Sequence, residues 1–253
     1  MIDLHCHILP AIDDGPKTMS ESLVMAKFAV ESGISHILCS PHHNDGQYDN
    51  GKKKVQDQVA ILQKALVKEK IPLRIYEGQE IRVSYDLFEK NEILTVDLER
   101  RYLLIEFPDE DIPPYVSSLF IKMIGRGLTP IIVHPERNKI IGRDIDRLIP
   151  FLEMGCLAQL TAPSYVGMYG KKIQRIAKKM VSQNMIQMIA SDAHGLDKRP
   201  FVLKEAYQKI QKDFGKEKIE NMQQVAKDIL NGDVVVASDY KKSKSKMIKF
   251  WRK

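Results

Sequence analysis

Cysteine is scarce in this chain of 253 residues, which contains three: Cys6, Cys39 and Cys156. Three scattered thiols are too few for a disulfide framework, and Cys39 lies inside an expected strand. We therefore predict a reducing, cytoplasmic setting. A long apolar run is also missing, and the N-terminus starts on a strand-like segment without a basic region, so the sequence predicts neither a signal peptide nor a membrane span.

Negative charge is missing from the end of the chain. Residues 241–253 carry seven Lys or Arg side chains and no Asp or Glu, and without them the formal net charge changes from +6 to −1. Because the body is nearly neutral, the high pI does not indicate nucleic-acid binding. We expect residues 241–253 to be a solubilising tail; the alternative is a weak contact with anionic lipid or an acidic partner.

The body of the chain alternates between strand-like apolar runs and amphipathic segments with helical spacing. The expected strands lie at residues 2–5, 36–40, 74–76, 102–107, 130–134, 157–160 and 187–191. The expected helices lie at residues 20–32, 55–69, 116–126, 145–154 and 171–183, and two later helices, at 202–214 and 216–230, should pack outside. In the first helix, Leu23, Ala26 and Val30 should lie on one face. Seven alternations without a linker predict an α/β fold, a single-domain closed parallel barrel.

Histidine and carboxylate side chains follow the expected strands. In a parallel barrel the carboxyl ends of the strands share one face, so these side chains should converge there. Imidazole and carboxylate are the ligands of hydrolytic divalent metals, and the sequence therefore predicts a multinuclear metal site. The candidate ligands are His5, His7, His42, Glu80, Glu106, His134, Asp192 and His194.

Residue spacing separates these candidates from their neighbours. Side chains two residues apart on a strand point to the same side, so His5 with His7, and Asp192 with His194, can each act as a pair. Adjacent side chains point to opposite sides, so we expect only one of His42 and His43 to be a ligand.

Four other polar residues lie near the expected strands. His36 stands early in its strand and should be structural or partly exposed, and Glu77 is a weaker candidate than Glu80. Asp13 and Asp14, in the first loop, could supply one more ligand or cap the following helix.

Two arginines, Arg137 and Arg199, come shortly after ligand-bearing segments. They could form salt bridges at the rim of the site. We favour a role in binding phosphate oxygens, because a guanidinium offers two parallel hydrogen bonds to such an anion.

These motifs together resemble a known family. The segments HCH, SPHH, GQEIR, IEFP, VHPERN and SDAH occur in this order, and they are similar to those of the PHP (polymerase and histidinol phosphatase) superfamily. Within it they resemble the bacterial protein-tyrosine phosphatases of capsule and exopolysaccharide operons. The resemblance covers residues 1–231 and implies a distorted (β/α)7 barrel, followed by a C-terminal extension at residues 232–253.

The resemblance also implies three divalent ions, with Mn²⁺ as the main expectation and Mg²⁺, Fe²⁺ or Zn²⁺ as alternatives. His5 and His7 would bind the first ion, and Glu80 would bridge it to a second that Glu106 and His134 complete. Asp192 would be a ligand of the first ion or a shared one. The third ion would be bound by His42, His194 and Asp14, with Asp13 as the alternative to Asp14, and Arg137 and Arg199 would bind phosphate.

The implied activity is hydrolysis of phosphotyrosine on a bacterial tyrosine kinase that controls polysaccharide export. A metal-activated hydroxide would attack phosphorus, and the tyrosyl leaving group, with a pKa of about 10, needs less acid assistance than an alkoxide would; the sequence assigns no general acid. A thiol mechanism is excluded, because Cys-based tyrosine phosphatases need Cys-x5-Arg and none of the three cysteines is followed by arginine at that spacing.

Other functions remain open at this point. A small-molecule phosphomonoesterase, for example one acting on a substrate like histidinol phosphate, would use the same metals. A non-enzymatic scaffold would bind the kinase or a membrane surface through residues 241–253. A role beside a DNA polymerase is disfavoured, because no polymerase segment is present and the body lacks net positive charge.

Overall fold

The computed structural model describes residues 1–89, 92–97, 99, 101–237 and 239–241. Within this part the strands are short and buried, and all of their pairings are parallel. They are β1 (Ile2–Cys6), β2 (His36–Cys39), β3 (His42–His43), β4 (Arg74–Glu77), β5 (Glu80–Arg82), β6 (Tyr102–Glu106), β7 (Thr129–Val133), β8 (Leu157–Thr161) and β9 (Met188–Ala190).

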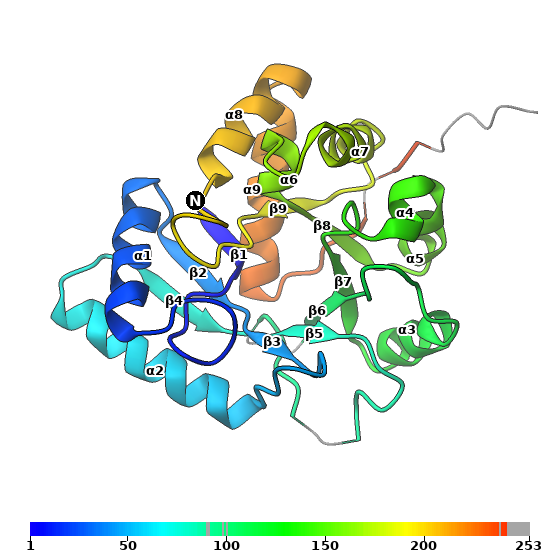
Figure 1. Ribbon diagram of the computed structural model, residues 1–253. Coiled ribbons are helices and arrows are strands. Elements are labelled where there is room, and N and C mark those ends of the chain that lie inside the picture. The colour runs from blue at the N-terminus through cyan, green and yellow to red at the C-terminus, as the bar shows by residue number, and fades with distance from the viewer. Residues whose placement is uncertain (90–91, 98, 100, 238, 242–253) are drawn as a thin grey trace, which may run out of the picture.

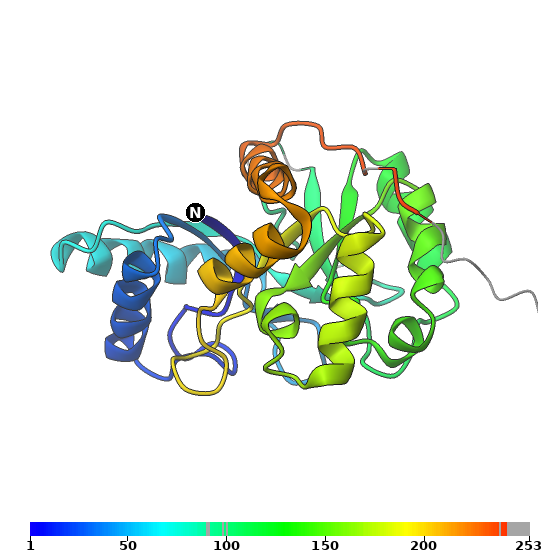
Figure 2. The same ribbon diagram turned by 90° about the horizontal axis from the view of Figure 1, so that it is seen from above.

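Helices connect the strands and surround them, with α1 and α2 on one side of the molecule and α3, α4 and α5 on the other (Figures 1 and 2). They are α1 (Met19–Glu31), α2 (Lys52–Lys68), α3 (Val116–Gly125), α4 (Lys139–Arg143), α5 (Ile149–Glu153), α6 (Ala162–Val166), α7 (Lys171–Ser182), α8 (Leu203–Phe214) and α9 (Lys216–Asn231). A short 3-10 helix, η1 (Ile145–Leu148), precedes α5.

The strands form two sheets, one with the order β1-β2-β4 and the other with the order β3-β5-β6-β7-β8-β9. Backbone contacts connect them: Cys6 and Ala193 form a bridge, and the amide of His7 donates to the carbonyl of Ala193 at 2.9 Å. The structure is thus a single α/β domain with parallel sheets, as expected. That these sheets make one closed (β/α)7 barrel is still a prediction.

The sequence reasoning missed β3 and β5, which continue β2 and β4 after short breaks. Pro41 has no amide hydrogen to donate to a neighbouring strand, which explains the first break. Gly78 lies at the second, where a Cβ atom would come within 3.0 Å of the Leu38 side chain. After these breaks the chain leaves the first sheet and enters the second, as β3 and as β5. There His42 pairs with Glu80.

The strands β6, β7 and β9 are buried on both faces, which explains the apolar runs in their sequences. Successive residues alternate between two clusters. Ile37 and Ile132 contribute to the cluster beneath the surrounding helices. Leu38 and Ile131 belong to the cluster on the other face of the strands, the inner cluster.

The helices agree with the expectations only in part. In α1 the fully buried residues are Ser22, Met25, Ala26 and Ala29. Leu23 and Val30, expected on the same face as Ala26, are only partly buried and pack against the core. The short helices α4 and α6 were not predicted. The prediction that α9 packs outside was wrong, because Ala226, Ile229 and Leu230 fill the cluster on the inner face of the strands.

The described part of the C-terminal extension lies against the domain. Tyr102 donates its hydroxyl to the carbonyl of Asp233 at 2.6 Å, and Val235 and Ala237 pack on the inner cluster. Most of the basic tail, residues 242–253, lies outside the described residues. Among the helices that the structure describes, we find none long and apolar enough to cross a membrane.

Candidate metal centre

Eight of the nine predicted ligands form three overlapping clusters of potential metal-binding atoms, all near the ends of strands. In each cluster one donor atom per residue lies within 4.8 Å of the others. The clusters are His5, His7, Glu80 and Asp192; His7, Asp14, His42 and His194; and His42, Glu80 and Glu106.

The first cluster is fully buried and its donor atoms face one another. The Nε2 atoms of His5 and His7 are 3.2 Å apart, as the same-side spacing on β1 predicted. The Glu80 Oε2 atom lies 3.2 and 3.1 Å from these nitrogens. Asp192 Oδ1, which comes from the segment after β9, lies 3.6 Å from each of them.

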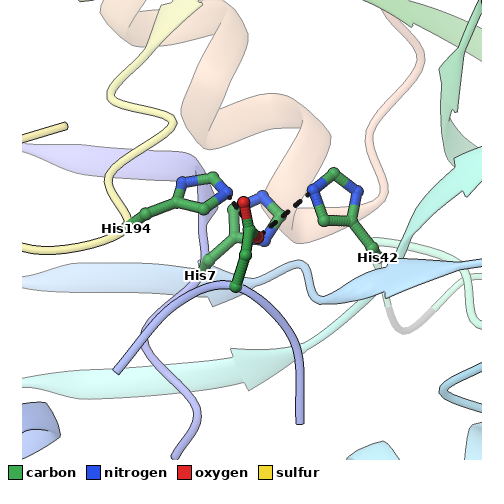
Figure 3. Close-up of side chains that lie close together, drawn as sticks. His7, His42 and His194 are labelled. Atoms are coloured by element: carbon green, nitrogen blue, oxygen red, sulfur yellow. Dashed lines mark ion pairs between the residues drawn. The ribbon is translucent and has the colours of Figure 1, made fainter. Parts of the chain in front are cut away.

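The second cluster joins the loop after β1 to β3 and to the segment after β9. The imidazoles of His7, His42 and His194 point toward one another (Figure 3), and the rings of His7 and His194 stack at 3.7 Å. Asp14 Oδ1 lies 3.1 Å from His194 Nε2 and 3.5 Å from His42 Nε2. Asp14 therefore has the geometry of a ligand with respect to these histidines.

The third cluster adds Glu106 to Glu80 and His42, which also belong to the other clusters. His42 Nδ1 is 3.1 Å from Glu80 Oε2, so Glu80 is common to two clusters. His134, the predicted ligand outside the three clusters, lies beside this one: its Nε2 atom is 2.6 Å from Glu80 Oε1 and 3.8 Å from Glu106 Oε1.

The buried polar atoms at this site fit divalent ions better than they fit one another. His42 Nδ1, Glu80 Oε2 and Asp192 Oδ1 are buried and make no hydrogen bond. A buried polar atom without a partner is costly. Two ligands of one ion at about 2.0–2.2 Å are separated by roughly 3.0–3.5 Å, which is close to the spacing of the donors in the first cluster. The imidazole and carboxylate set also suits metals such as Mn²⁺, Zn²⁺ or Fe²⁺.

Burial and neighbouring charges strongly shift the pKa values of residues at this site. Burial opposes the charged form of His7, but Asp13 and Glu80 raise its pKa to about 10. Burial and the Glu80 carboxylate raise the pKa of Glu106 to about 8. For His194, burial and the charge of His7 lower the pKa to about 4. Such opposed shifts in one place are typical of functional sites.

Several residues support the candidate ligands. Nδ1 of His7 donates to Asp13 Oδ2 at 2.8 Å, and Nδ1 of His5 donates to Gln159 Oε1 at 2.9 Å. Arg82 Nη2 lies 2.9 Å from Glu106 Oε2. Sequence reasoning missed Gln159 and Arg82, although the Arg in GQEIR was a usable signal because it follows Glu80 by two residues.

Of the two roles considered for the aspartate pair, capping was wrong. The side chain of Thr18 caps α1 by accepting from the amide of Glu21. Asp13 instead accepts from His7 and from the amide of Gly15, so it orients a candidate ligand.

The neighbouring residues that sequence reasoning set aside lie apart from the clusters. His43 Nδ1 is 3.0 Å from Asp49 Oδ1, so the adjacent histidines diverge as expected. Glu77 accepts a hydrogen bond from Gln56, and His36 is partly exposed and contacts Ser35. Cys6, which lies between His5 and His7 in the sequence, is buried in the core.

The two arginines meet at the carboxylate of Asp192. Its Oδ2 atom lies 2.9 Å from Arg137 Nη1 and 2.5 Å from Arg199 Nη2, while its Oδ1 atom belongs to the first cluster. Both arginine side chains are about a quarter exposed. They line a hollow of about 430 Å³ together with Asp109, Lys139, Tyr169 and Ile173.

The backbone is held in an unusual conformation at two of these positions. His134 has φ 37° and Asp192 has φ 53°, in the left-handed region that residues with a Cβ atom seldom adopt. Such conformations are tolerated when surrounding contacts fix them and are concentrated at functional sites.

Comparison with known proteins agrees with this geometry. The family model described as "Capsular polysaccharide synthesis, CpsB/CapC" matches residues 1–231. The tyrosine-protein phosphatase YwqE of Bacillus subtilis is 40% identical over 220 residues, 86% of each chain. The putative tyrosine-protein phosphatase CapC of Staphylococcus aureus is 40% identical over 209 residues, 82% of each chain.

A solved structure is similar over nearly the whole chain. It comes from a study of YwqE from Bacillus subtilis and CpsB from Streptococcus pneumoniae, described as unique metal-dependent tyrosine phosphatases. It superimposes with a TM-score of 0.91 at 37% identity and covers 96% of this chain and 100% of the other. The chain therefore belongs to the CpsB/CapC family of capsular polysaccharide synthesis proteins.

Proposed function

We propose that this chain is a metal-dependent protein-tyrosine phosphatase. The observation that carries the proposal is the shared carboxylate of Asp192, one oxygen of which faces His5 and His7 while the other holds Arg137 and Arg199. Two guanidinium groups thus lie directly beside a set of metal-binding atoms. Their positive charge and parallel hydrogen-bond donors suit the negatively charged oxygens of a phosphoryl group. The tyrosine-protein phosphatases among its relatives support the same activity.

We propose that the donor set binds three divalent ions. The main physiological metal would be Mn²⁺. His5, His7, Glu80 and Asp192 would bind the first, and Glu80, Glu106 and His134 the second. Asp14, His42 and His194 would bind the third. When bound, such ions lower the pKa of water toward neutrality and offset the charge of a phosphoryl group.

The protein's own residues position the substrate. Arg137 and Arg199 would bind phosphoryl oxygens through parallel hydrogen bonds, and Asp192 keeps both guanidinium groups at the edge of the hollow. A tyrosyl oxygen, with an ordinary pKa of about 10, leaves more readily than an alkoxide. The site therefore needs less proton donation for phosphotyrosine than for phosphoserine.

The cysteines do not offer an alternative nucleophile. All three are free and buried, and burial raises the pKa of the Cys156 thiol to about 12 and those of Cys6 and Cys39 above their ordinary values. Only the thiolate is nucleophilic. Hydrolysis by a thiol is therefore inconsistent with the arrangement as well as with the sequence.

The proposal extends to the substrate, the cellular setting and the arrangement of the chain. The substrate would be a tyrosine-phosphorylated bacterial kinase of a capsule or exopolysaccharide pathway, and the three unpaired thiols suit a cytoplasmic setting. The two sheets would form one distorted (β/α)7 barrel over residues 1–231, supported by the backbone contacts between β1 and the segment after β9. Residues 232–253 would then be an extension with an accessory role.

A substrate panel tests the activity. The protein, supplied with Mn²⁺, is assayed with a phosphotyrosine peptide, the same peptide carrying phosphoserine, and small phosphomonoesters that include histidinol phosphate. We expect the phosphotyrosine peptide to have the highest kcat/KM. A clear preference for a small phosphomonoester would reject the proposal in favour of a metabolic phosphatase, and no turnover of any substrate would favour the scaffold role.

A further inference from the structure

Tyr169 is an aromatic residue beside the two arginines that the reaction described above does not use. It lies in a turn between α6 and α7, flanked by Gly167 and Gly170 with φ values of 97° and 89°. A Cβ atom at Gly167 would also come within 2.9 Å of the Gln174 side chain. The turn therefore depends on glycine, and it directs Tyr169 into the hollow next to the arginines.

The ring of Tyr169 is held in place by these cations. The guanidinium carbon of Arg137 lies 5.6 Å from the centre of the ring, within the range of a cation–π contact. The hydroxyl interacts with Arg199, and burial together with the Asp192 charge raises its pKa, so it remains neutral near pH 7. Ile173, at the start of α7, adds an apolar side chain to the same hollow.

The hollow thus has two unlike parts. At its inner edge, Arg137 and Arg199 meet the Asp192 carboxylate and the metal-binding cluster. Beside them, Tyr169 and Ile173 line the hollow, together with Asp109 and Lys139. A phosphate bound by the arginines would have its ester oxygen directed outward, so the group attached to that oxygen lies beside Tyr169. An aromatic ring fits this position, because offset or edge-on ring pairs are favourable.

We propose that Tyr169 is a specificity-determining residue whose ring packs against the phenyl ring of a phosphotyrosine bound by Arg137 and Arg199. This inference rests on the phosphatase function proposed above and adds the means by which aryl phosphates are preferred to alkyl phosphates. A phosphoserine or phosphothreonine bound through the same phosphate contacts would leave the Tyr169 face without a partner.

Binding of two phosphonates that cannot be hydrolysed tests this independently of turnover. Phenylphosphonate and methylphosphonate are titrated calorimetrically into the Mn²⁺-loaded protein and into three variants. In Tyr169→Ala, we expect the Kd for phenylphosphonate to rise about five- to tenfold, the worth of one aromatic pair, with little change for methylphosphonate. Tyr169→Phe should keep the preference, because the ring remains. Met168→Ala is the matched control, since Met168 is an exposed neighbour in the same turn.

Kinetics give a second readout. In Tyr169→Ala the kcat/KM ratio of a phosphotyrosine peptide to the same phosphothreonine peptide should fall by a similar factor, mainly through KM. An unchanged ratio of the two phosphonate affinities in Tyr169→Ala would overturn the inference, as would an equal loss for both phosphonates, which would indicate that Tyr169 only positions the arginines. Failure of the unaltered chain to hydrolyse phosphotyrosine would instead refute the proposed function and remove the basis of the inference.

Discussion

The carboxylate of Asp13 accepts a hydrogen bond from Nδ1 of His7 at 2.8 Å, and both side chains are almost completely buried. This contact fixes the ring so that Nε2 of His7 faces Glu80 and Asp192. A second oxygen of Asp13 accepts from the amide of Gly15 at 3.0 Å. Asp13 thus ties the loop that carries Asp14 to the orientation of His7.

Replacement of Asp13 by Asn should weaken metal binding while leaving the set of proposed ligands intact. The amide no longer supplies the negative charge that makes His7 more basic, and loss of such a partner typically costs about 10–100-fold in metal affinity. Calorimetric titration of the metal-depleted protein with Mn²⁺ measures the change in affinity. Asp49→Asn is the control, because Asp49 pairs with His43 Nδ1 at 3.0 Å outside the clusters. Equal Mn²⁺ affinities for Asp13→Asn and the unaltered chain would contradict this role.

Removal of metal should abolish activity and also destabilise the fold. The buried donors face one another, and each ion bound only by the folded state would stabilise it by about 2.7 kcal/mol at a hundred times its Kd. We expect a chelator to lower Tm and Mn²⁺ to restore both Tm and turnover. Iodoacetamide at modest dose should have no effect, because the three thiols are buried. Full turnover in the presence of chelator would rule out a metal mechanism.

The sequence predicts the arrangement of this site to the extent that it depends on strand ends. His5 and His7 follow from alternation on one strand, and the apolar runs place His134 and Asp192 correctly after β7 and β9. Both of these residues nevertheless adopt positive φ, which no local pattern indicated. Their conformation depends on contacts made by distant segments, such as the hydrogen bond from the amide of Asp192 to the carbonyl of His5 at 2.9 Å.

Other features depend on tertiary packing and were beyond reach. The strand β3 has two residues, and its pairing with β5 exists only because Pro41 and Gly78 redirect the chain into the second sheet. The apolar face of α9 has the same periodicity whether it packs outside a sheet or against its inner face. Gln159 looks like any polar residue in an apolar strand until the fold brings it to His5.

The metal-free protein should lose stability as pH rises through neutrality, with Glu106 as one cause. Burial and Glu80 raise the pKa of Glu106 from 4.5 to about 8, so the folded state binds this proton more tightly than the unfolded chain. The contribution of this proton to the free energy of unfolding is fully present below pH 4.5 and is lost as pH rises through 8. His7, with a pKa raised from 6.5 to about 10, acts in the same direction at higher pH.

Urea unfolding of metal-depleted protein at pH 5, 6.5 and 8 measures this loss. Glu106→Gln cannot ionise, so its free energy of unfolding should fall less over this range, by on the order of a few kcal/mol. Parallel curves for the variant and the unaltered chain would show that Glu106 does not carry the effect.

Replacement of Arg199 by Lys should reduce catalysis more than it reduces stability. A lysine keeps the charge but not the fork that contacts both Asp192 Oδ2 and His194 Nε2, at 2.5 and 2.9 Å. We expect kcat/KM for a phosphotyrosine peptide to fall about 10²-fold and the inhibition constant of inorganic phosphate to rise. Arg147→Lys is the control, because Arg147 is two-thirds exposed and pairs with Asp144. Similar kinetics for both variants would argue against phosphate binding by Arg199.

Replacement of Gly15 by Ala should disrupt the loop that carries Asp13 and Asp14. A Cβ atom at this position would lie 2.3 Å from the backbone carbonyl oxygen of His7, a contact that only backbone movement can relieve. We expect a loss of about 1–3 kcal/mol in the free energy of unfolding and weaker Mn²⁺ binding, because displacement of His7 or Asp14 opens the second cluster.

Gly125→Ala is the matched control for this change. A Cβ atom at Gly125, the last residue of α3, meets nothing within 4 Å. Alanine there should be neutral or stabilising by up to about 1 kcal/mol. If Gly15→Ala unfolds at the same urea concentration as Gly125→Ala and binds Mn²⁺ as tightly, the close approach of this loop to His7 does not hold the second cluster together. Asp14 would then be positioned by His42 and His194 alone.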